Sequence, residues 1–236
     1  MFHNLNLSYG SFKLLEGTSF NASISYSRFL EGIRNSTEIN GINQIQTLIN
    51  TGLPENNYSA RLNYSTSIWG LKWSYSGNAN FSNYKRIINE REFDYQSLFM
   101  MNKIDLATRF KKGPNFEIET EYQFNAINGG GIANSFQNWN TAGTMELRLF
   151  NDFLFLMTYD LTYFRNNTSD QSNKFNNAKA SLEYWQKSSA WSFIIEVTNA
   201  FNNSVRITNN VSQFQSSESR LCVQPRILLL SVTYKL

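Results

Sequence analysis

Residues Leu71 to Ser82 read LKWSYSGNANFS, and this stretch decides the fold class. Large apolar side chains stand at alternate positions, at Leu71, Trp73, Tyr75 and Phe81. Polar side chains stand between them, at Lys72, Ser74, Ser76 and Ser82. Successive side chains of a β-strand point to opposite faces, so this period of two predicts a strand with one apolar and one polar face.

The same period recurs along most of the chain. Apolar residues alternate with Ser, Asn, Glu, Lys and Arg in stretches 20–26, 58–64, 100–110, 116–124, 145–149, 178–184, 191–197 and 228–236. The spacings of three and four that an amphipathic helix needs are not sustained anywhere. Aromatic residues make up 15% of the chain, and they favour strands. We therefore expect an all-β protein.

The connections between these stretches alternate between two kinds. Short ones are expected near Leu14–Gly17, Ser67–Gly70, Lys111–Asn115, Asn151–Asp152 and Lys187–Ala190. Longer polar ones are expected at Glu31–Asn43, Ile87–Glu92, Ala126–Ser135, Asn166–Ser172 and Asn203–Ser217. Transmembrane β-barrels alternate in this way, and their tilted strands need about 9–11 residues. We predict one domain, residues 1–236, that is an antiparallel up-and-down transmembrane β-barrel of about eleven strands.

Composition excludes several other classes of protein. Lys and Arg number 21 and Asp and Glu 18, so the net charge of +3 gives no electrostatic case for nucleic-acid binding. One Cys and one His exclude an internal disulfide and Cys-cluster or paired-His metal sites. No apolar run is long enough for a transmembrane helix, and the first residues lack the pattern of a signal peptide. No nucleophile–base pair is visible, so we expect neither an enzyme nor a cofactor.

In such a barrel the apolar series faces lipid and the polar series faces a wet lumen. The lumen-facing candidates are Arg61, Lys103, Arg109, Glu117, Glu119 and Glu121. Trp and Tyr near strand ends fit a girdle at the membrane interface, which we assign to Trp69, Trp73, Trp185, Trp191 and Tyr234. The alternative is a soluble sandwich whose core the aromatic residues fill. Strand length and the alternation of connections argue against it.

Two short motifs contain residue types that occur in catalytic or phosphate-binding sites. Glu117, Glu119 and Glu121 are either a cation-attracting stripe, or an acid–base pair in a pocket that separates two pKa values, or simply a solvated lumen face, which we favour. Gly129–Gly131 lacks the Lys-Ser/Thr pair and the following helix of a phosphate loop, so it indicates a flexible external loop. The Asn- and Ser-rich loops suit ligand recognition, but their composition names no substrate.

The segments Val197–Asn203, Arg220–Arg226 and Ile227–Leu236 resemble the C-terminal end of TonB-dependent outer-membrane receptors. In that family an Asn-x-Phe-Asn turn, here Asn199, Phe201 and Asn202, leads from a strand into an external loop. The last strand then resembles the signal that the barrel-assembly machinery reads. Its positions here are Leu228, Leu230, Val232, Tyr234 and Leu236, with Leu at the terminus where Phe is more usual.

The resemblance implies a part in nutrient import. A complete receptor of this family has a 22-stranded barrel, an N-terminal plug and a short TonB-contacting segment, whereas this chain shows about half the strands and neither of the other parts. We expect the C-terminal half of such a barrel in the outer membrane of a Gram-negative bacterium, for uptake of a glycan, peptide or metal chelate. Expected partners are outer-membrane lipid, the barrel-assembly machinery and an N-terminal barrel half with the plug, but no nucleic acid.

Two other functions stay open at this point. A small self-contained outer-membrane barrel would act as a passive pore or a surface-binding protein. It would need a strand count that differs by one, because bacterial single-chain barrels have even numbers of strands. A soluble all-β binding module, such as a secreted glycan binder, would have strands of about five or six residues and a closed two-sheet core.

Overall fold

The computed structural model describes residues 2–30, 32–40, 43–111, 113–150, 152–185, 189–211 and 216–235. Fifteen strands lie in these ranges, and no helix does. They form one large sheet and one separate two-stranded sheet. The prediction of an all-β fold is therefore confirmed.

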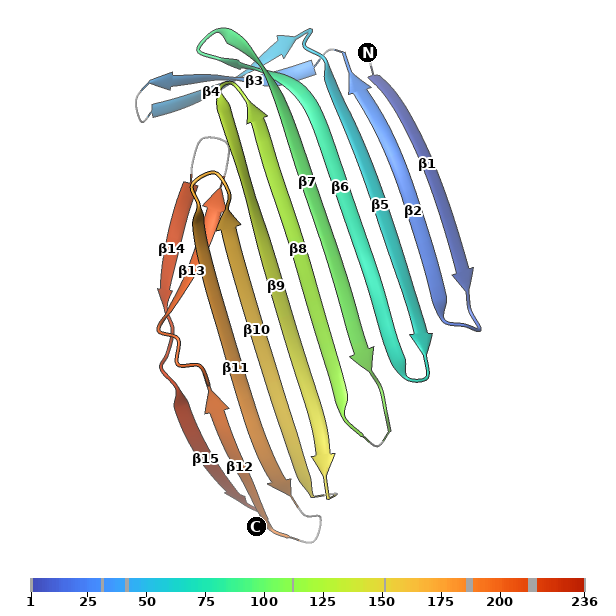
Figure 1. Cartoon of the computed structure of the whole chain (residues 1–236), viewed down its shortest axis with the longest axis vertical. Coiled ribbons are helices and arrows are strands. Elements are labelled where there is room, and N and C mark those ends of the chain that lie inside the picture. Colours follow the sequence, from blue (N-terminus) through green and yellow to red (C-terminus); the bar gives the residue numbers. More distant parts are fainter. Residues whose placement is uncertain are drawn as a thin grey trace.

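The large sheet contains a continuous meander of eleven strands, in which each strand pairs antiparallel with the next (Figure 1). These strands are β1 (Phe2–Lys13), β2 (Thr18–Phe29), β5 (Glu55–Ile68), β6 (Leu71–Ile88), β7 (Arg91–Thr108), β8 (Asn115–Gly129), β9 (Ile132–Leu149), β10 (Phe153–Asn166), β11 (Gln171–Trp185), β12 (Trp191–Thr198) and β15 (Ile227–Tyr234). The antiparallel up-and-down order agrees with the prediction.

Tight turns with left-handed backbone join the long central strands. Trp69 and Gly70 connect β5 to β6 with φ angles of 50° and 83°. Asn89 and Glu90 connect β6 to β7 with φ angles of 48° and 67°. Two consecutive positive φ angles are typical of the type I′ turn, whose twist matches that of the strands it joins. These turns fix the register, and so they decide which side chains share a face.

Two of the predicted long loops are wrong, because Ile87–Glu92 and Ala126–Ser135 are mostly strand. Strands β6, β7 and β9 have 18 residues each and run through these polar stretches. The predicted flexible loop at Gly129–Gly131 is instead a tight turn, with Gly130 and Gly131 at φ angles of 59° and 79°. Polar composition suggested loops, but polar residues also pair across strands where the sheet extends beyond its apolar part.

Two other predicted long connections, Glu31–Asn43 and Asn203–Ser217, each cover only the first strand of a hairpin that the strand count of eleven omits. The first hairpin is β3 (Gly32–Asn40) with β4 (Asn43–Thr51), and the second is β13 (Val205–Val211) with β14 (Ser216–Cys222). The first joins the large sheet through a short parallel pairing of Ser36 and Thr37 with Ile87 and Ile88 at the end of β6. The second forms the separate sheet.

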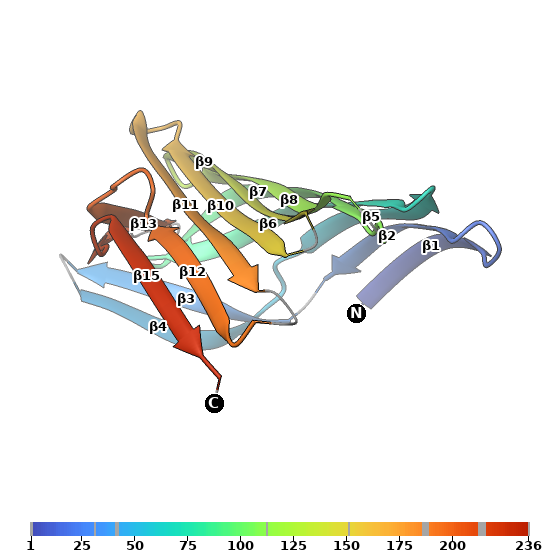
Figure 2. The same ribbon diagram turned by 90° about the horizontal axis from the view of Figure 1, so that it is seen from below.

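The large sheet is an open arch (Figure 2). In the described ranges β1 pairs only with β2, and β15 pairs within the meander only with β12, so the first and last strands do not meet. The sheet is therefore antiparallel and strongly curved, but it is not a closed barrel. Hairpin β3–β4 lies on the concave side of the arch.

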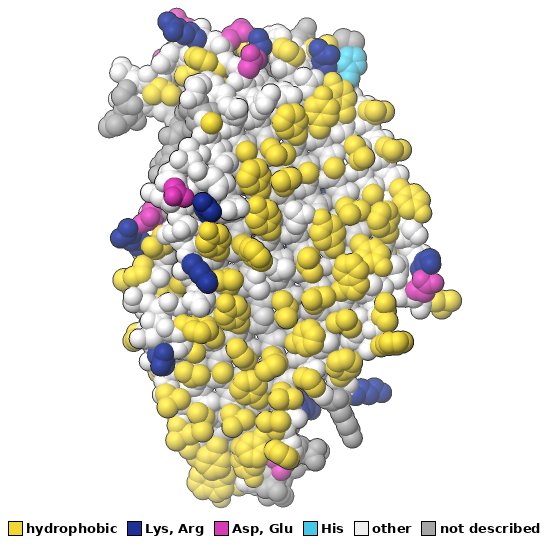
Figure 3. Space-filling model, in the orientation of Figure 1, with side chains coloured by type: hydrophobic (Ala, Val, Ile, Leu, Met, Phe, Trp, Pro, Cys, Tyr) yellow, Lys and Arg dark blue, Asp and Glu magenta, His cyan; other side chains and the backbone are white. Residues whose placement is uncertain are grey.

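The register places the apolar series on the convex side and the polar series on the concave side. One convex row joins Leu7, Ile24, Ala60, Ala79, Met100 and Phe124 across six strands. Hydrophobic side chains cover most of this face, and most charged ones lie toward its margins (Figure 3).

The convex face has no cover within the described part of the chain. Among all the described residues, the only buried apolar ones are Tyr95, Phe164, Phe175 and Ala178. The accessible surface is 16223 Å². A compact monomer of 27.3 kDa would expose about 11,000 Å². The described part of the chain thus has one large apolar sheet face that none of its own elements covers.

A turn after β12 fixes the path into the β13–β14 hairpin and back. Asn199 is 5% exposed and has a φ angle of 47°. Its side-chain Nδ2 donates to the carbonyls of Asn203 at 2.8 Å and Gln224 at 2.7 Å, and its Oδ1 accepts from the Asn203 amide at 3.1 Å. The Arg226 amide, just before β15, donates to Asn202 Oδ1 at 3.0 Å. This Asn-Ala-Phe-Asn turn therefore holds both ends of the connection.

We expect Asn199→Ala to lower the free energy of unfolding by about 2–4 kcal/mol, because it removes buried hydrogen bonds and forces a Cβ into left-handed backbone. Asn199→Gly loses the same bonds but tolerates the backbone, so it should retain about 1 kcal/mol more. Chemical denaturation of the full chain measures both. Equal stabilities for the wild type and Asn199→Ala would show that the turn is not held in this way.

Candidate binding face

Along each strand, alternate positions face the concave side, and we call these positions the concave parity. The predicted lumen-facing residues all occupy such positions, with Arg109 directly after the end of β7. Glu117, Glu119 and Glu121 of β8 pair in register with Ala107, Asp105 and Lys103 of β7. Arg61 of β5 stands in a separate row, opposite Ser23 and Asn78. The structure thus brings the β7–β8 group together and leaves Arg61 two strands away from it.

The three glutamates do not form an acidic patch, because basic and amide groups lie among them. Lys103 Nζ is 2.9 Å from Glu119 Oε2 and 3.5 Å from Asp105 Oδ1. Arg109 Nη2 is 3.3 Å from Glu117 Oε2. The side-chain Nε2 of Gln123 donates to Glu121 Oε1 at 2.6 Å. This charge ladder, as we call Lys103, Asp105, Arg109, Glu117 and Glu119, agrees with a solvated face rather than an acid–base pair.

The predicted girdle residues gather at the end of the sheet that holds the β5–β6 turn. Trp73, Trp191 and Tyr234 belong to the convex series, and the rings of Trp191 and Tyr234 are 4.7 Å apart. Trp69 lies in the β5–β6 turn. Trp185 ends β11 opposite Ser192, on the concave parity, so Tyr184 is the girdle-like residue at that strand end. Their role at a membrane interface stays a prediction.

A second row of aromatic residues, which the sequence analysis missed, crosses the convex face nearer the other end of the strands. Its members are Tyr26, Tyr58, Phe81, Tyr122, Trp139 and Tyr163. The rings of Tyr26 and Tyr58 are 5.0 Å apart. The signal was present in the sequence, because each of these residues except Tyr122 is at one end of an alternating apolar series.

Polar side chains on the convex face bond to one another. Tyr75 donates its hydroxyl to Asn102 Oδ1 at 2.6 Å. The hydroxyls of Thr120 and Thr141 are 3.0 Å apart, and Trp139 Nε1 donates to Thr120 Oγ1 at 2.8 Å. Such pairs satisfy polar groups without water.

The predicted assembly-signal strand is β15. Leu228, Leu230, Val232 and Tyr234 lie on the convex face, opposite Val197, Ile195, Phe193 and Trp191 of β12. All four are exposed, and the Leu228 side chain is 72% accessible. Leu236 lies outside the described residues.

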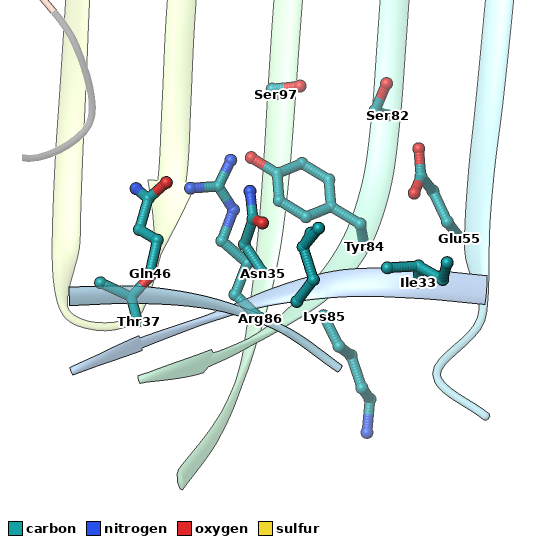
Figure 4. Close-up of a pocket in the computed structure, with 11 residues that line it drawn as sticks. Ile33, Asn35, Thr37, Gln46, Glu55, Ser82, Tyr84, Lys85, Arg86 and Ser97 are labelled. Atoms are coloured by element: carbon teal, nitrogen blue, oxygen red, sulfur yellow. The ribbon is translucent and has the colours of Figure 1, made fainter. Parts of the chain in front are cut away.

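Two of the pockets on the concave side each lie beside one of the hairpins. One of about 460 Å³ is between the β3–β4 hairpin and strands β5–β7 (Figure 4). The other, of about 510 Å³, is lined by Asp160, Asn177 and Phe175 of the wall and by Arg206 of β13. The Arg206 guanidinium is 5.6 Å from the centre of the Phe175 ring. Neither pocket is predictable from a local sequence pattern, because each is formed by segments far apart in the chain.

Comparison with protein-family models, with curated proteins and with solved structures finds no match for this chain. Among the described residues no group of His, Cys, Asp and Glu side chains is arranged to hold a metal ion. In the same ranges no helix is long and apolar enough to cross a bilayer.

We expect the Lys103–Glu119 ion pair to contribute little to the free energy of unfolding, because both side chains are partly exposed. A double-mutant cycle with Lys103→Met and Glu119→Gln should give a coupling energy of about 0.2–1 kcal/mol in chemical denaturation. Salt at about 1 M should reduce it, since the Debye length then shrinks to about 3 Å. A coupling that high salt leaves unchanged would contradict a solvated ladder.

Proposed function

We propose that this chain is a C-terminal portion of the wall of a TonB-dependent importer in the outer membrane, where it serves the uptake of a large nutrient. Its convex face lies against hydrocarbon and its concave face lines the lumen. The remaining wall strands and the plug come from elsewhere. The chain carries no catalysis in this role; it encloses and helps to recognise the nutrient.

The observation that carries the proposal is the constant height of the apolar band on the convex face. In five strands the band covers Tyr58–Ile68, Leu71–Phe81, Phe116–Ala126, Trp139–Leu149 and Phe153–Tyr163, ten residue steps in each. Ten steps extend about 33 Å along a strand. At the tilt of 35–45° usual in membrane barrels this gives a height of about 25 Å, which is that of the apolar band of such barrels.

Charge and hydrogen bonding follow the same band. Charged residues of the convex parity, such as Lys85 of β6 and Arg165 of β10, lie just beyond it. The polar groups inside it pair with one another, as Tyr75 does with Asn102. Among the buried polar side-chain atoms that lack a partner in the described residues, that of Asn83 lies beyond the end of the band, and those of Tyr95, Asn134 and Asn177 belong to the concave series. Hydrocarbon demands this arrangement because it offers no hydrogen bonds.

Strand direction supports a partial wall over a self-contained barrel. Ten antiparallel steps separate β1 from β15, so the two edge strands run the same way. Figure 1 shows both arrows pointing toward the same end. Joining β1 to β15, in one copy or between two copies in the same membrane orientation, would create a parallel seam. A wall segment with an odd number of strands, whose edges run the opposite way, completes the barrel with antiparallel seams only.

Adjacent methionines test which face meets lipid. Met100 points to the convex side, opposite Ala79 and Phe124, and Met101 points to the concave side, opposite Asn78 and Gln123. In phosphatidylcholine vesicles we expect Met100→Arg to lower the free energy of unfolding by about 2–4 kcal/mol. Met101→Arg should change it by less than about 0.5 kcal/mol. Urea titration of the reconstituted full chain measures both.

The same preparation decides between lipid and water. Asn83→Arg places an arginine on the convex face beyond the band. It should lower the free energy of unfolding only slightly, because the penalty falls to about 0–1 kcal/mol near the interface. Equal losses at positions 83 and 100 would contradict a hydrocarbon layer. A monodisperse, water-soluble monomer without detergent would end the proposal.

Pairs of introduced cysteines test whether β1 and β15 of one chain pair with each other. In a Cys222→Ser background, Leu7→Cys with Leu230→Cys, and neighbouring β1–β15 pairs, should give no intrachain disulfide, because these edges do not meet in an antiparallel seam. Leu7→Cys with Ile24→Cys, which are direct partners in β1 and β2, is the positive control. Gel mobility of the oxidised chain is the measurement. A β1–β15 disulfide in a heat-modifiable species would instead favour the self-contained barrel.

A further inference from the structure

The β3–β4 hairpin is fixed over the concave face by the turn between β6 and β7. The Asn89 amide donates to the Thr37 carbonyl at 2.9 Å. Asn89 Oδ1 accepts from the Ile39 amide at 2.8 Å, and Asn89 Nδ2 donates to the Ile39 carbonyl at 3.4 Å. The pairing of Ser36 and Thr37 with β6 adds to these bonds. The pocket beneath the hairpin is therefore preformed.

Side chains from the hairpin and the wall line this pocket from opposite sides (Figure 4). Asn35 and Gln46 come from the hairpin, and Tyr84 and Ser82 come from β6. Many of the lining groups are amides or hydroxyls, which both donate and accept hydrogen bonds. Two aliphatic residues of the hairpin, Ile33 and Leu48, also line it and are 67% and 71% exposed.

A rigid aromatic stack forms part of the wall. The rings of Tyr84 and Tyr95 are stacked with centroids 5.8 Å apart, and the Arg86 guanidinium lies 5.0 Å and 5.6 Å from the two ring centres. Tyr95 is 1% exposed and anchors the stack. Tyr84 and Arg86 line the pocket. This arrangement presents an aromatic ring and a guanidinium whose positions are set before any ligand arrives.

The charge of the lining is nearly balanced. Arg86 is basic and Glu55 is acidic, and Glu55 Oε1 already accepts from Asn57 Nδ2 at 2.8 Å. Lys85 points away from the pocket in Figure 4, and its Nζ is 3.5 Å from Glu92 Oε2. Among the described lining side chains, a highly charged metal chelate would meet one guanidinium only, and an apolar peptide would meet few aliphatic groups.

We propose that this pocket binds an uncharged oligosaccharide. Adjacent hydroxyls of a sugar match planar groups that offer two neighbouring polar atoms, as Asn35 and Gln46 do. The C–H face of a sugar ring packs on Tyr84, while Ile33 and Leu48 cover its other apolar edge. The inference deepens the proposed importer by naming its substrate class, and it rests on that proposal only for the route by which the sugar arrives.

Binding of defined probes to the full chain in detergent tests the inference. Isothermal titration with maltohexaose, xylohexaose and mannohexaose should show saturable binding of at least one of them. Tyr84→Ala and the double variant Asn35→Ala/Gln46→Ala should weaken it at least tenfold. Lys85→Ala, beside Tyr84 but directed away, should stay within twofold of the wild type. Saturable binding that these pocket variants leave unchanged would overturn the assignment.

A positioning variant separates pocket geometry from direct contact. Asn89→Gly keeps the left-handed backbone of the turn but removes both side-chain bonds to Ile39. It should weaken sugar binding at least threefold while the urea midpoint of the whole chain stays the same. Unchanged binding in Asn89→Gly would show that the hairpin anchor has no part in the site.

The outcomes distinguish the two proposals. If the chain inserts into lipid with the predicted Met100 and Met101 behaviour but binds no hexaose, the sugar site fails and the importer wall stands. Binding of an anionic chelate or a peptide pool in place of sugars also overturns the sugar site. If the chain binds a hexaose through Tyr84 yet is a water-soluble monomer, the importer proposal fails and the site stands.

Discussion

A sheet with one apolar face is stable in water only when something covers that face. In this protein the convex face extends across eleven strands, and the described residues supply no second layer. The strict period of two concentrates apolar groups on that face, and the type I′ turns preserve the register from strand to strand. The small number of buried apolar side chains among the described residues follows from this one uncovered surface.

The concave face obeys a different rule. Several of its charges form neighbouring opposite pairs, such as Lys103 with Glu119 and Lys179 with Glu196, each at 2.9 Å. Such pairs add little stability in water, but they keep a polar surface from carrying a strong net field. A surface built in this way neither repels nor captures ions strongly, and under the proposed function this suits the passage of an uncharged solute.

Periodicity was sufficient to predict the fold class, the antiparallel order and the concave position of Glu117, Glu119 and Glu121. It failed where polar residues continue a strand, as at Ile87–Glu92, because alternation disappears when both faces of a sheet are polar. It also failed to foresee that Trp185 lies on the concave parity, since one residue of shift at a strand end reverses the face. The pocket beneath the β3–β4 hairpin depends on contacts between residues about fifty positions apart, which no local pattern encodes.

The two hairpins show where such a wall is free to acquire specificity. A convex residue is restricted to apolar types if hydrocarbon covers it, and every meander residue is restricted by its partners on both sides. The chain leaves the meander at β3–β4 and β13–β14, and each of these hairpins helps to enclose a pocket with the concave face. Because these hairpins lie outside the eleven-strand meander, substitutions of their side chains leave the register of the long strands intact. Under the proposed function, recognition belongs on these inserted elements, and the long strands supply the rigid surface against which a ligand is held.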